Sequence, residues 1–147
     1  MQNDPSGTPA RRTRDTYRPA HLGRRSKGPV TQVDRIPWDG GAITVELVCD
    51  EFTSLCPVTG QPDFGTLTVR YAPCRWLIES KSLKLYLWQF REQGIFNETL
   101  VDRIVQELFD QVQPDWIEVG GEFHSRGGIA IRATGRRETD PDNPLPF

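Results

Sequence analysis

Residues 79–86, Glu-Ser-Lys-Ser-Leu-Lys-Leu-Tyr, are the segment from which the fold is predicted. A polar stretch with one carboxylate, two hydroxyls and two ammonium groups leads directly into an apolar pattern of helical period. The positions i, i+3, i+4 and i+7 are Leu83, Tyr86, Leu87 and Phe90. We therefore predict a helix over residues 81–92, ended by Gly94, with Ser80 or Ser82 as its N-cap.

The start of this helix is also a candidate anion site. Unpaired N–H groups and the positive end of the helix dipole favour an anion there, and Lys81 and Lys84 add positive charge for a phosphate. The same residues equally fit a capped surface helix with solvated lysines, so their chemistry alone leaves both interpretations open.

Charge is unevenly distributed along the chain, whose 147 residues indicate one domain. Residues 1–29 hold seven basic against two acidic side chains, a net +5, and the remainder holds eleven basic against eighteen acidic, a net −7. A basic segment can contact nucleic acid or a membrane surface, but this one lacks aromatic interleaving and amphipathic spacing. We predict a flexible arm over 1–29, a folded domain over 30–135 and a polar tail over 136–147.

The cysteines are Cys49, Cys56 and Cys74, and their spacing indicates no disulfide framework. With His124 they are numerous enough for zinc, but no C-x₂-C or H-x₃-H spacing is present, so we predict no metal site. Rossmann and P-loop glycine signatures are absent as well. No apolar run approaches about 18 residues and no signal-peptide core follows the first methionine, so we expect a cytoplasmic protein without a membrane contact.

Four strands are predicted from the alternation of apolar side chains. Residues 43–49 and 66–71 form the first pair, separated by a loop over 50–64 that contains two prolines and a glycine. Residues 115–123 and 128–133 form the second pair, joined through His-Ser-Arg-Gly.

A second helix is predicted to begin with Asn97 as its N-cap and to end before Pro114. Its apolar positions repeat at helical spacing: Leu100, Val101, Ile104, Val105 and Leu108. The element order ββααββ predicts an α+β fold, a four-stranded antiparallel sheet with two helices on one face. One sheet face and both edges are left uncovered, so we expect the subunits to associate.

Cys56 is the candidate nucleophile because it lies in the polar, turn-rich loop, where no apolar alternation accounts for it. A loop thiol is accessible, and its thiolate is the nucleophilic form. Asp63, seven residues further on, can fold back beside it and exchange protons. A half-buried structural cysteine and a turn-forming aspartate are the alternatives.

Asn97, Glu98 and Arg126 are further candidates. An N-cap and an acid in the first turn suit the start of a helix, but a carboxylate there can also accept two N–H donors from a guanine-like edge. Arg126 precedes two glycines, in a loop whose backbone can approach a ligand closely or that is only a hairpin turn.

Several segments, in order, resemble the NADPH-dependent nitrile reductases of queuosine biosynthesis, the 7-cyano-7-deazaguanine (preQ0) reductases of the QueF type, in their single-module form. The resemblance extends over about residues 30–133. The matching segments are Phe-Thr-Ser-Leu-Cys-Pro at 52–57, Gln-Pro-Asp-Phe at 61–64, Glu-Ser-Lys-Ser-Leu-Lys-Leu-Tyr at 79–86, Phe-Asn-Glu at 96–98 and Arg-Gly-Gly at 126–128.

The resemblance implies a tunnelling fold (T-fold), in which small sheets from several subunits assemble into a barrel, here a homo-oligomer expected as stacked rings. It implies that Cys56 adds to the nitrile carbon as a thioimide, that Asp63 donates a proton, and that two hydrides from NADPH give the aminomethyl product, preQ1. The implied substrate contacts are Ile78, Glu79, Ser80, Asn97 and Glu98, and the implied NADPH phosphate contacts are Lys81, Lys84 and Arg126. No direct nucleic-acid partner is expected.

The chain departs from the family at Asn97, where histidine is usual; an amide hydrogen-bonds but supplies no proton near neutral pH. Three alternatives to the reductase share parts of this pattern. T-fold amidinotransferases act on the same nitrile within tRNA but should lack the intact Glu-Ser-Lys-Ser-Leu-Lys segment. T-fold GTP cyclohydrolases need a metal or a different base. A non-catalytic purine-binding module is disfavoured because Cys56 and Asp63 are both present.

Overall fold

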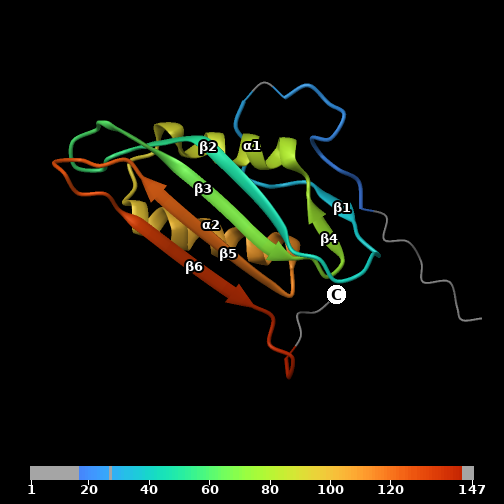
Figure 1. Cartoon of the computed structure of the whole chain (residues 1–147). Helices are drawn as coiled ribbons and strands as arrows, with labels where there is room; N and C mark the ends of the chain where they lie inside the picture. The colour runs from blue at the N-terminus through green and yellow to red at the C-terminus, as the bar shows by residue number, and fades with distance from the viewer. Residues whose placement is uncertain (1–16, 27, 144–147) are drawn as a thin grey trace, which may run out of the picture.

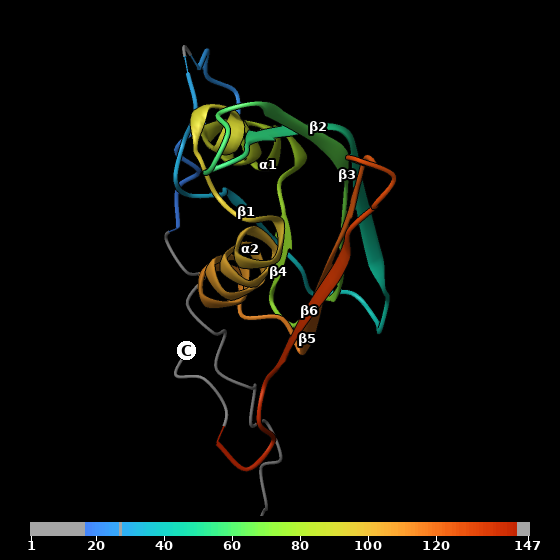
Figure 2. The same ribbon diagram turned by 90° about the vertical axis from the view of Figure 1, so that its left-hand side faces the viewer.

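The computed structural model describes residues 17–26 and 28–143, and its centre is an antiparallel sheet of four strands (Figure 1). The strands are β2 (Val45–Leu55), β3 (Pro62–Ala72), β5 (Trp116–Phe123) and β6 (Arg132–Glu138), in the spatial order β2-β3-β5-β6. Figure 2 shows that α1 (Ser80–Trp88) and α2 (Asn97–Val112) lie on the same face of this sheet. The predicted α+β architecture is confirmed.

Along the central strands, side chains alternate between the two faces of the sheet, and the two faces differ in polarity. The side chains of β3 and β5 that face the helices are buried: Leu67, Val69, Tyr71, Ile117 and Val119. The opposite face is mainly polar and carries ion pairs, for example Arg70 Nε to Glu46 Oε2 at 3.2 Å and Arg136 Nη1 to Glu118 Oε2 at 3.7 Å. Among the described residues, β2 and β6 each pair with one strand, which leaves both outer edges open.

A second, smaller sheet was not predicted. It pairs β1 (Arg35–Pro37) with β4 (Trp76–Ile78) in antiparallel register, with Arg35 opposite Ile78. Three-residue strands are too short to show an alternating pattern, so sequence periodicity did not indicate them. This sheet determines where the chain enters α1, because Glu79 follows β4 directly.

The first predicted helix is correct in extent, since α1 is followed directly by the 3₁₀ helix η1 (Gln89–Glu92), but both predicted N-caps are wrong. Glu79 caps α1, with Oε1 accepting from the Lys81 N–H and Oε2 from the Ser82 N–H, each at 2.8 Å. Asn97 is the first residue of α2 and caps nothing; the capping position is Phe96, which makes no side-chain bond.

The predicted loop over 50–64 is also wrong in extent, because the strands take most of it. Strand β2 runs on to Leu55 and β3 begins at Pro62, leaving six loop residues. A register shift between Cys49 and Phe52 inserts one extra residue into β2. Such a bulge breaks the alternation of side chains and hides the rest of the strand from a periodicity argument.

The last strand lies further along the chain than predicted, at β6 rather than over 128–133. Of the two isoleucines that suggested the earlier position, Ile129 closes a tight turn, in which Arg126 and Ile129 exchange backbone hydrogen bonds, and Ile131 follows two residues later. Strand β6 is an edge strand rich in arginine, so its sequence lacks the expected apolar side chains. It extends into the segment predicted as a polar tail.

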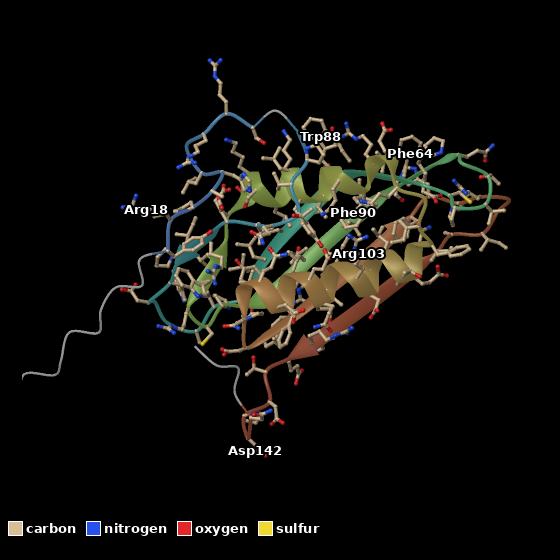
Figure 3. All side chains as sticks on the ribbon, turned by 180° about the vertical axis from the view of Figure 1, so that it is seen from behind. Arg18, Phe64, Trp88, Phe90, Arg103 and Asp142 are labelled. Carbon is tan, nitrogen blue, oxygen red and sulfur yellow. The ribbon has the colours of Figure 1, made fainter. Side chains whose placement is uncertain are left out.

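Aromatic packing joins the two helices. Figure 3 shows Phe90 inside the molecule, with Arg103 of α2 beside it. The Tyr86 and Phe90 rings meet edge to face with centroids 5.6 Å apart, and the Arg103 guanidinium lies 5.1 Å from the Phe90 centroid. The Tyr86 hydroxyl donates to Glu107, and its burial raises the pKa of this phenol. These contacts hold α1 against α2. They therefore also fix the positions of the residues at both ends of α1.

The predicted division into arm, domain and tail remains a prediction. Residues 17–26 of the predicted arm nevertheless contact the domain: the N–H groups of Ala20, His21 and Leu22 donate to the Asp34 carboxylate. This segment passes over α1 in Figure 1. Contacts with the domain therefore begin before residue 30.

Candidate active site

Cys56 directly follows β2, in the loop over residues 56–61 that returns the chain to β3. Its N–H donates to Gln61 O at 2.8 Å, and its carbonyl accepts from the Gly60 N–H at 2.9 Å. Gly60 has a φ of 71°, in the left-handed region that favours glycine. Backbone hydrogen bonds, rather than apolar packing, therefore hold this partly exposed thiol in place.

Hydrogen bonds to the sulfur activate Cys56. The Thr59 hydroxyl, the N–H groups of Thr59 and Val58, and the Arg126 side chain together lower the pKa of Cys56 from 9.0 to about 6. A thiol with that pKa is roughly nine-tenths thiolate at pH 7. Burial instead raises the pKa of Cys49 and of Cys74. Of the three cysteines, Cys56 is therefore the one whose thiolate, the nucleophilic form, is favoured near neutral pH.

Asp63 and Arg126 form an ion pair beside this thiol. Asp63 is the second residue of β3, is 7% exposed and lies opposite Ser54 of β2. Arg126 Nη2 lies 2.7 Å from Asp63 Oδ1 and donates to Pro62 O at 3.1 Å. Gly127 and Gly128, both with positive φ, follow the arginine in its turn. Arg126 thus connects the thiol to the acid, a role that the sequence did not indicate.

The start of α2 lies beside the same loop. Leu55 donates its N–H to Gln93 O at 3.0 Å, and Ile95 donates its N–H to Leu55 O at 3.1 Å. Asn97 follows two residues later and is 8% exposed. Its neighbour Glu98 is exposed in the first turn of α2.

Two buried polar atoms near this end of the sheet have no hydrogen-bond partner within residues 17–26 and 28–143. They are Oγ of Ser54, which is fully buried, and Oδ1 of Asn97. Leaving such an atom unpaired costs about 1–3 kcal/mol, so each calls for a partner that the isolated chain does not supply. Ser54 was not predicted as a site residue; its position two residues before Cys56 was the available signal.

Ile78, Glu79 and Ser80 lie away from this group, at the opposite end of α1. The nine residues of α1 span about 13 Å at roughly 1.5 Å per residue, and Cys56 lies near the residues that follow η1. Figure 1 shows the same separation, with the start of α1 beside β4 and the 56–61 loop at the far end of the sheet. One chain thus divides the predicted site between two places.

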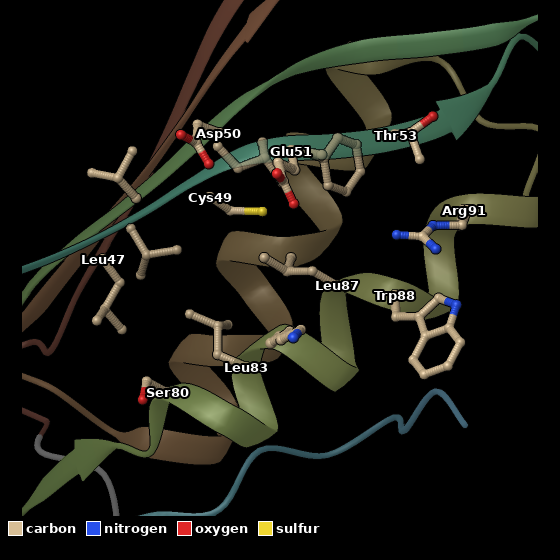
Figure 4. Close-up of a pocket in the computed structure, with 15 residues that line it drawn as sticks. Leu47, Cys49, Asp50, Glu51, Thr53, Ser80, Leu83, Leu87, Trp88 and Arg91 are labelled. Carbon is tan, nitrogen blue, oxygen red and sulfur yellow. The ribbon is translucent and has the colours of Figure 1, made fainter. Parts of the chain in front are cut away.

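A cavity of about 640 Å³ lies between β2 and α1. Figure 4 shows Cys49 and Leu87 facing each other across it, with Ser80 and Arg91 towards opposite ends of the helical side. Its apolar lining includes Leu47, Cys49, Leu83 and Leu87, and its polar residues include Asp50, Glu51, Ser80, Lys84 and Arg91. The volume falls within the roughly 300–1,000 Å³ of small-molecule sites.

The three cations expected at the cofactor do not form one cluster. Lys81 Nζ donates to the backbone carbonyl oxygens of His21 and Arg24. Lys84 lines the cavity, and Arg126 is paired with Asp63 at the other end of the sheet. Within the described part of the chain, no group of three or more His, Cys, Asp or Glu side chains is placed to hold a metal ion. No helix there is long and apolar enough to cross a membrane.

Comparison with known proteins gives consistent results. The family model described as "QueF-like protein" matches residues 62–142. A protein of Anaeromyxobacter sp. (strain Fw109-5) named NADPH-dependent 7-cyano-7-deazaguanine reductase is 48% identical over 97 residues, 66% of this chain and 80% of that protein. The protein of the same name from Brucella ovis is 43% identical over 116 residues, 75% of each chain. The crystal structure titled archaeosine synthase QueF-Like in the apo form has a TM-score of 0.60 at 16% identity and covers 71% of this chain and all of its own, which shows a shared fold.

Proposed function

This chain belongs to the QueF-like family of T-fold proteins, and we propose that it reduces the nitrile of preQ0 to the aminomethyl group of preQ1 with two NADPH, a step of queuosine biosynthesis. The curated relatives bear the name of this activity. The observation that carries the proposal is the ionised thiol of Cys56, held on a closed loop with an acid and an arginine beside it.

The first step is the addition of the Cys56 thiolate to the nitrile carbon. A C–S bond forms, one π bond of the nitrile breaks, and its electron pair moves to nitrogen, which takes a proton to give a thioimide. Hydride addition at the same carbon and loss of the thiolate then give an imine. A second hydride gives the amine, so that two NADPH and two protons are consumed and Cys56 is regenerated.

Asp63 is proposed to carry the proton in the first step. Because Cys56 is already ionised, the proton comes from solvent: the Asp63 carboxylate takes it up and passes it to the nitrile nitrogen as the C–S bond forms. Arg126 supports this role because it contacts both the thiol and Asp63. Asn97 contributes hydrogen bonds only, since an amide does not titrate near neutral pH.

NADPH, when bound, supplies two hydrides. The residues present fit its phosphates at α1, where Lys81 and Lys84 are exposed and lie three positions apart on one helix face. We propose these two lysines as the phosphate contacts. Arg126 is the weakest of the three candidates, because a phosphate contact there competes with its ion pair to Asp63; Lys81 Nζ has two backbone carbonyls as partners and keeps a third N–H for a phosphate.

We further propose that a second copy of the chain completes each site. Glu79 and Ser80 lie too far from Cys56 to share one substrate with it in a single chain, and β2 and β6 have open edges among the described residues. Sheet edges joined between copies would place the start of α1 of one copy near the 56–61 loop of the next. In such a homo-oligomer, one deazaguanine would contact Ile78, Glu79 and Ser80 of one copy and Asn97 and Glu98 of the next. A cytoplasmic location remains the expectation from the sequence.

The test is a turnover assay with purified protein, preQ0 and NADPH. We expect about two NADPH oxidised for each nitrile consumed and an adduct of preQ0 on Cys56, detected by intact mass when NADPH is withheld. An adduct without NADPH oxidation would instead support an amidinotransferase, which uses the same thioimide; the fold shared with an archaeosine synthase keeps that alternative open. If the protein forms no adduct and oxidises no NADPH, both the reductase and the amidinotransferase are contradicted.

A further inference from the structure

Asp34 is a buried carboxylate that the proposed mechanism does not use. It directly precedes β1 and is 1% exposed. The N–H groups of Ala20, His21 and Leu22 donate to its two oxygens at 2.8, 2.6 and 2.7 Å. Burial raises the pKa of Asp34, but these three backbone hydrogen bonds outweigh it, so the pKa is lowered overall. The carboxylate therefore stays ionised inside the protein.

The backbone of the same residue is bonded to the signature segment. The Asp34 N–H donates to Ser82 Oγ at 2.8 Å, and Asp34 O accepts from the Glu79 N–H at 3.0 Å. Ser82 Oγ in turn donates to Glu79 O at 2.9 Å. Asp34 thus contacts Glu79 through its main chain and residues 20–22 through its side chain.

Residues 17–26, here called the strap, are also held to the domain by contacts of side chains other than that of Asp34. At one end the Tyr17 hydroxyl donates to Asp34 Oδ1 at 3.3 Å and accepts from the Arg35 N–H at 3.0 Å. The Arg35 guanidinium lies over two rings that meet edge to face, 4.5 Å from the centroid of Tyr17 and 4.6 Å from that of Trp76. At the other end of the strap, Lys81 Nζ donates to the carbonyl oxygens of His21 and Arg24.

We propose that Asp34 is a positioning residue for Glu79, and that the strap keeps Asp34 in place. The proposal rests on the proposed function, in which Glu79 contacts the deazaguanine. Glu79 has both carboxylate oxygens bonded to α1 N–H groups and its own N–H bonded to Asp34, so its position depends directly on that of Asp34. Loosening the strap moves Asp34, and a displaced Asp34 moves the substrate contact without touching Cys56.

The test compares the full-length Asp34→Asn variant with the wild-type protein. An amide presents an NH₂ group to three N–H donors, so the strap should detach. We expect the KM for preQ0 to rise about tenfold, since small displacements of a binding group have large effects, while kcat stays within about threefold. Hydrogen exchange should speed up at the amides of residues 20–22 and also at those of Lys81 and Ser82.

Asp140→Asn is the matched control. Asp140 Oδ1 also accepts a backbone N–H, that of Asp142 at 2.9 Å, but in an exposed turn far along the chain from the site. This variant should leave the KM for preQ0 and the exchange of Lys81 and Ser82 unchanged. Tyr17→Phe removes one hydroxyl from the strap and serves if Asp34→Asn does not fold; we expect its KM to rise about two- to fivefold.

The outcomes separate positioning from simple stabilisation. A KM for preQ0 that stays at the wild-type value, while the amides of residues 20–22 exchange faster, would overturn the inference, because the strap would then stabilise the fold without positioning Glu79. A wild-type protein that oxidises no NADPH in the presence of preQ0 would instead contradict the proposed function. The two failures are therefore distinguishable.

Discussion

Arg126 Nη2 lies 2.7 Å from Asp63 Oδ1, and the same guanidinium hydrogen-bonds to the sulfur of Cys56. The arginine comes from the turn between β5 and β6, whereas the other two residues flank the turn between β2 and β3. The ion pair therefore connects two hairpins and brings the nucleophile, the acid and a cation into one group.

Replacing Arg126 should weaken the nucleophile. In Arg126→Gln, the sulfur loses one of the groups that lower its pKa, and Asp63 loses its ion-pair partner. We expect the pKa of Cys56 to rise and kcat to fall by about 10- to 100-fold, at or below the lower end of the roughly 10²–10⁴-fold that acid–base catalysis contributes, because Asp63 itself is kept. Steady-state NADPH oxidation measures this. Arg132→Gln, which removes an exposed arginine 3.9 Å from Glu122, should leave kcat unchanged, and an equal fall in both variants would contradict the role of Arg126.

The low pKa of Cys56 should appear directly in its alkylation. Because a lowered pKa extends the thiolate to lower pH, the rate of reaction with iodoacetamide should rise as the pH passes about 6 and level off above it. Cys74, whose pKa is raised, should still be gaining reactivity at pH 9 and serves as the control in the same sample. Thr59→Val should shift the pH midpoint of Cys56 alkylation upward, since the Thr59 hydroxyl contributes most to the lowered pKa. An unchanged midpoint would show that Thr59 does not stabilise the thiolate. Peptide mass spectrometry measures both sites.

Removing the thiol should abolish turnover. Cys56→Ala leaves no nucleophile to form the thioimide, so we expect no NADPH oxidation above background and no preQ0 adduct by intact mass. Cys74→Ala removes an exposed thiol and should retain full activity and the adduct. Turnover by Cys56→Ala would show that reduction proceeds without a covalent intermediate.

Ser54 and Ser82 give a paired stability prediction. Both are fully buried, but Ser82 Oγ makes two hydrogen bonds and Ser54 Oγ makes none among the described residues. Ser82→Ala should lower the free energy of unfolding by about 1–3 kcal/mol, because it leaves the Asp34 N–H without its partner. Ser54→Ala should be neutral or stabilising while raising the KM for preQ0. Denaturant unfolding and kinetics measure the two effects; a Ser54→Ala variant as unstable as Ser82→Ala would mean that Ser54 has a structural partner.

Asn97→His tests the departure from the family. A histidine at the start of α2 introduces a group that titrates near pH 6.5, so kcat/KM should gain an additional pH-dependent limb near that value if this position takes part in proton transfer. We expect activity to stay within about tenfold, since thioimide formation relies on Cys56 and Asp63. Asn97→Gln keeps an amide and should show no new limb, and the same profile in both variants would exclude any proton transfer at this position.

The sequence by itself determined the order of the four main strands and two helices, the helical period after Glu79, the partly exposed cysteine in a turn-rich loop and the family. All of these depend on residues close together in the chain, or on segments compared one by one. The same local evidence failed where the pattern was interrupted. The bulge at Cys49 hid the end of β2, the arginine-rich edge strand β6 looked like a tail, and β1 and β4 were too short to detect.

Only the tertiary structure decided which side chains meet. It gave the N-cap of α1 to Glu79, paired Arg126 with Asp63, left Ser54 Oγ and Asn97 Oδ1 without partners, and joined the strap to the signature segment through Asp34. It also placed Glu79 and Cys56 at opposite ends of α1. Apart from the local cap by Glu79, these outcomes depend on contacts between segments far apart in the chain, such as Arg126 to Asp63. No local periodicity encodes such contacts, because they exist only after the sheet and helices have packed.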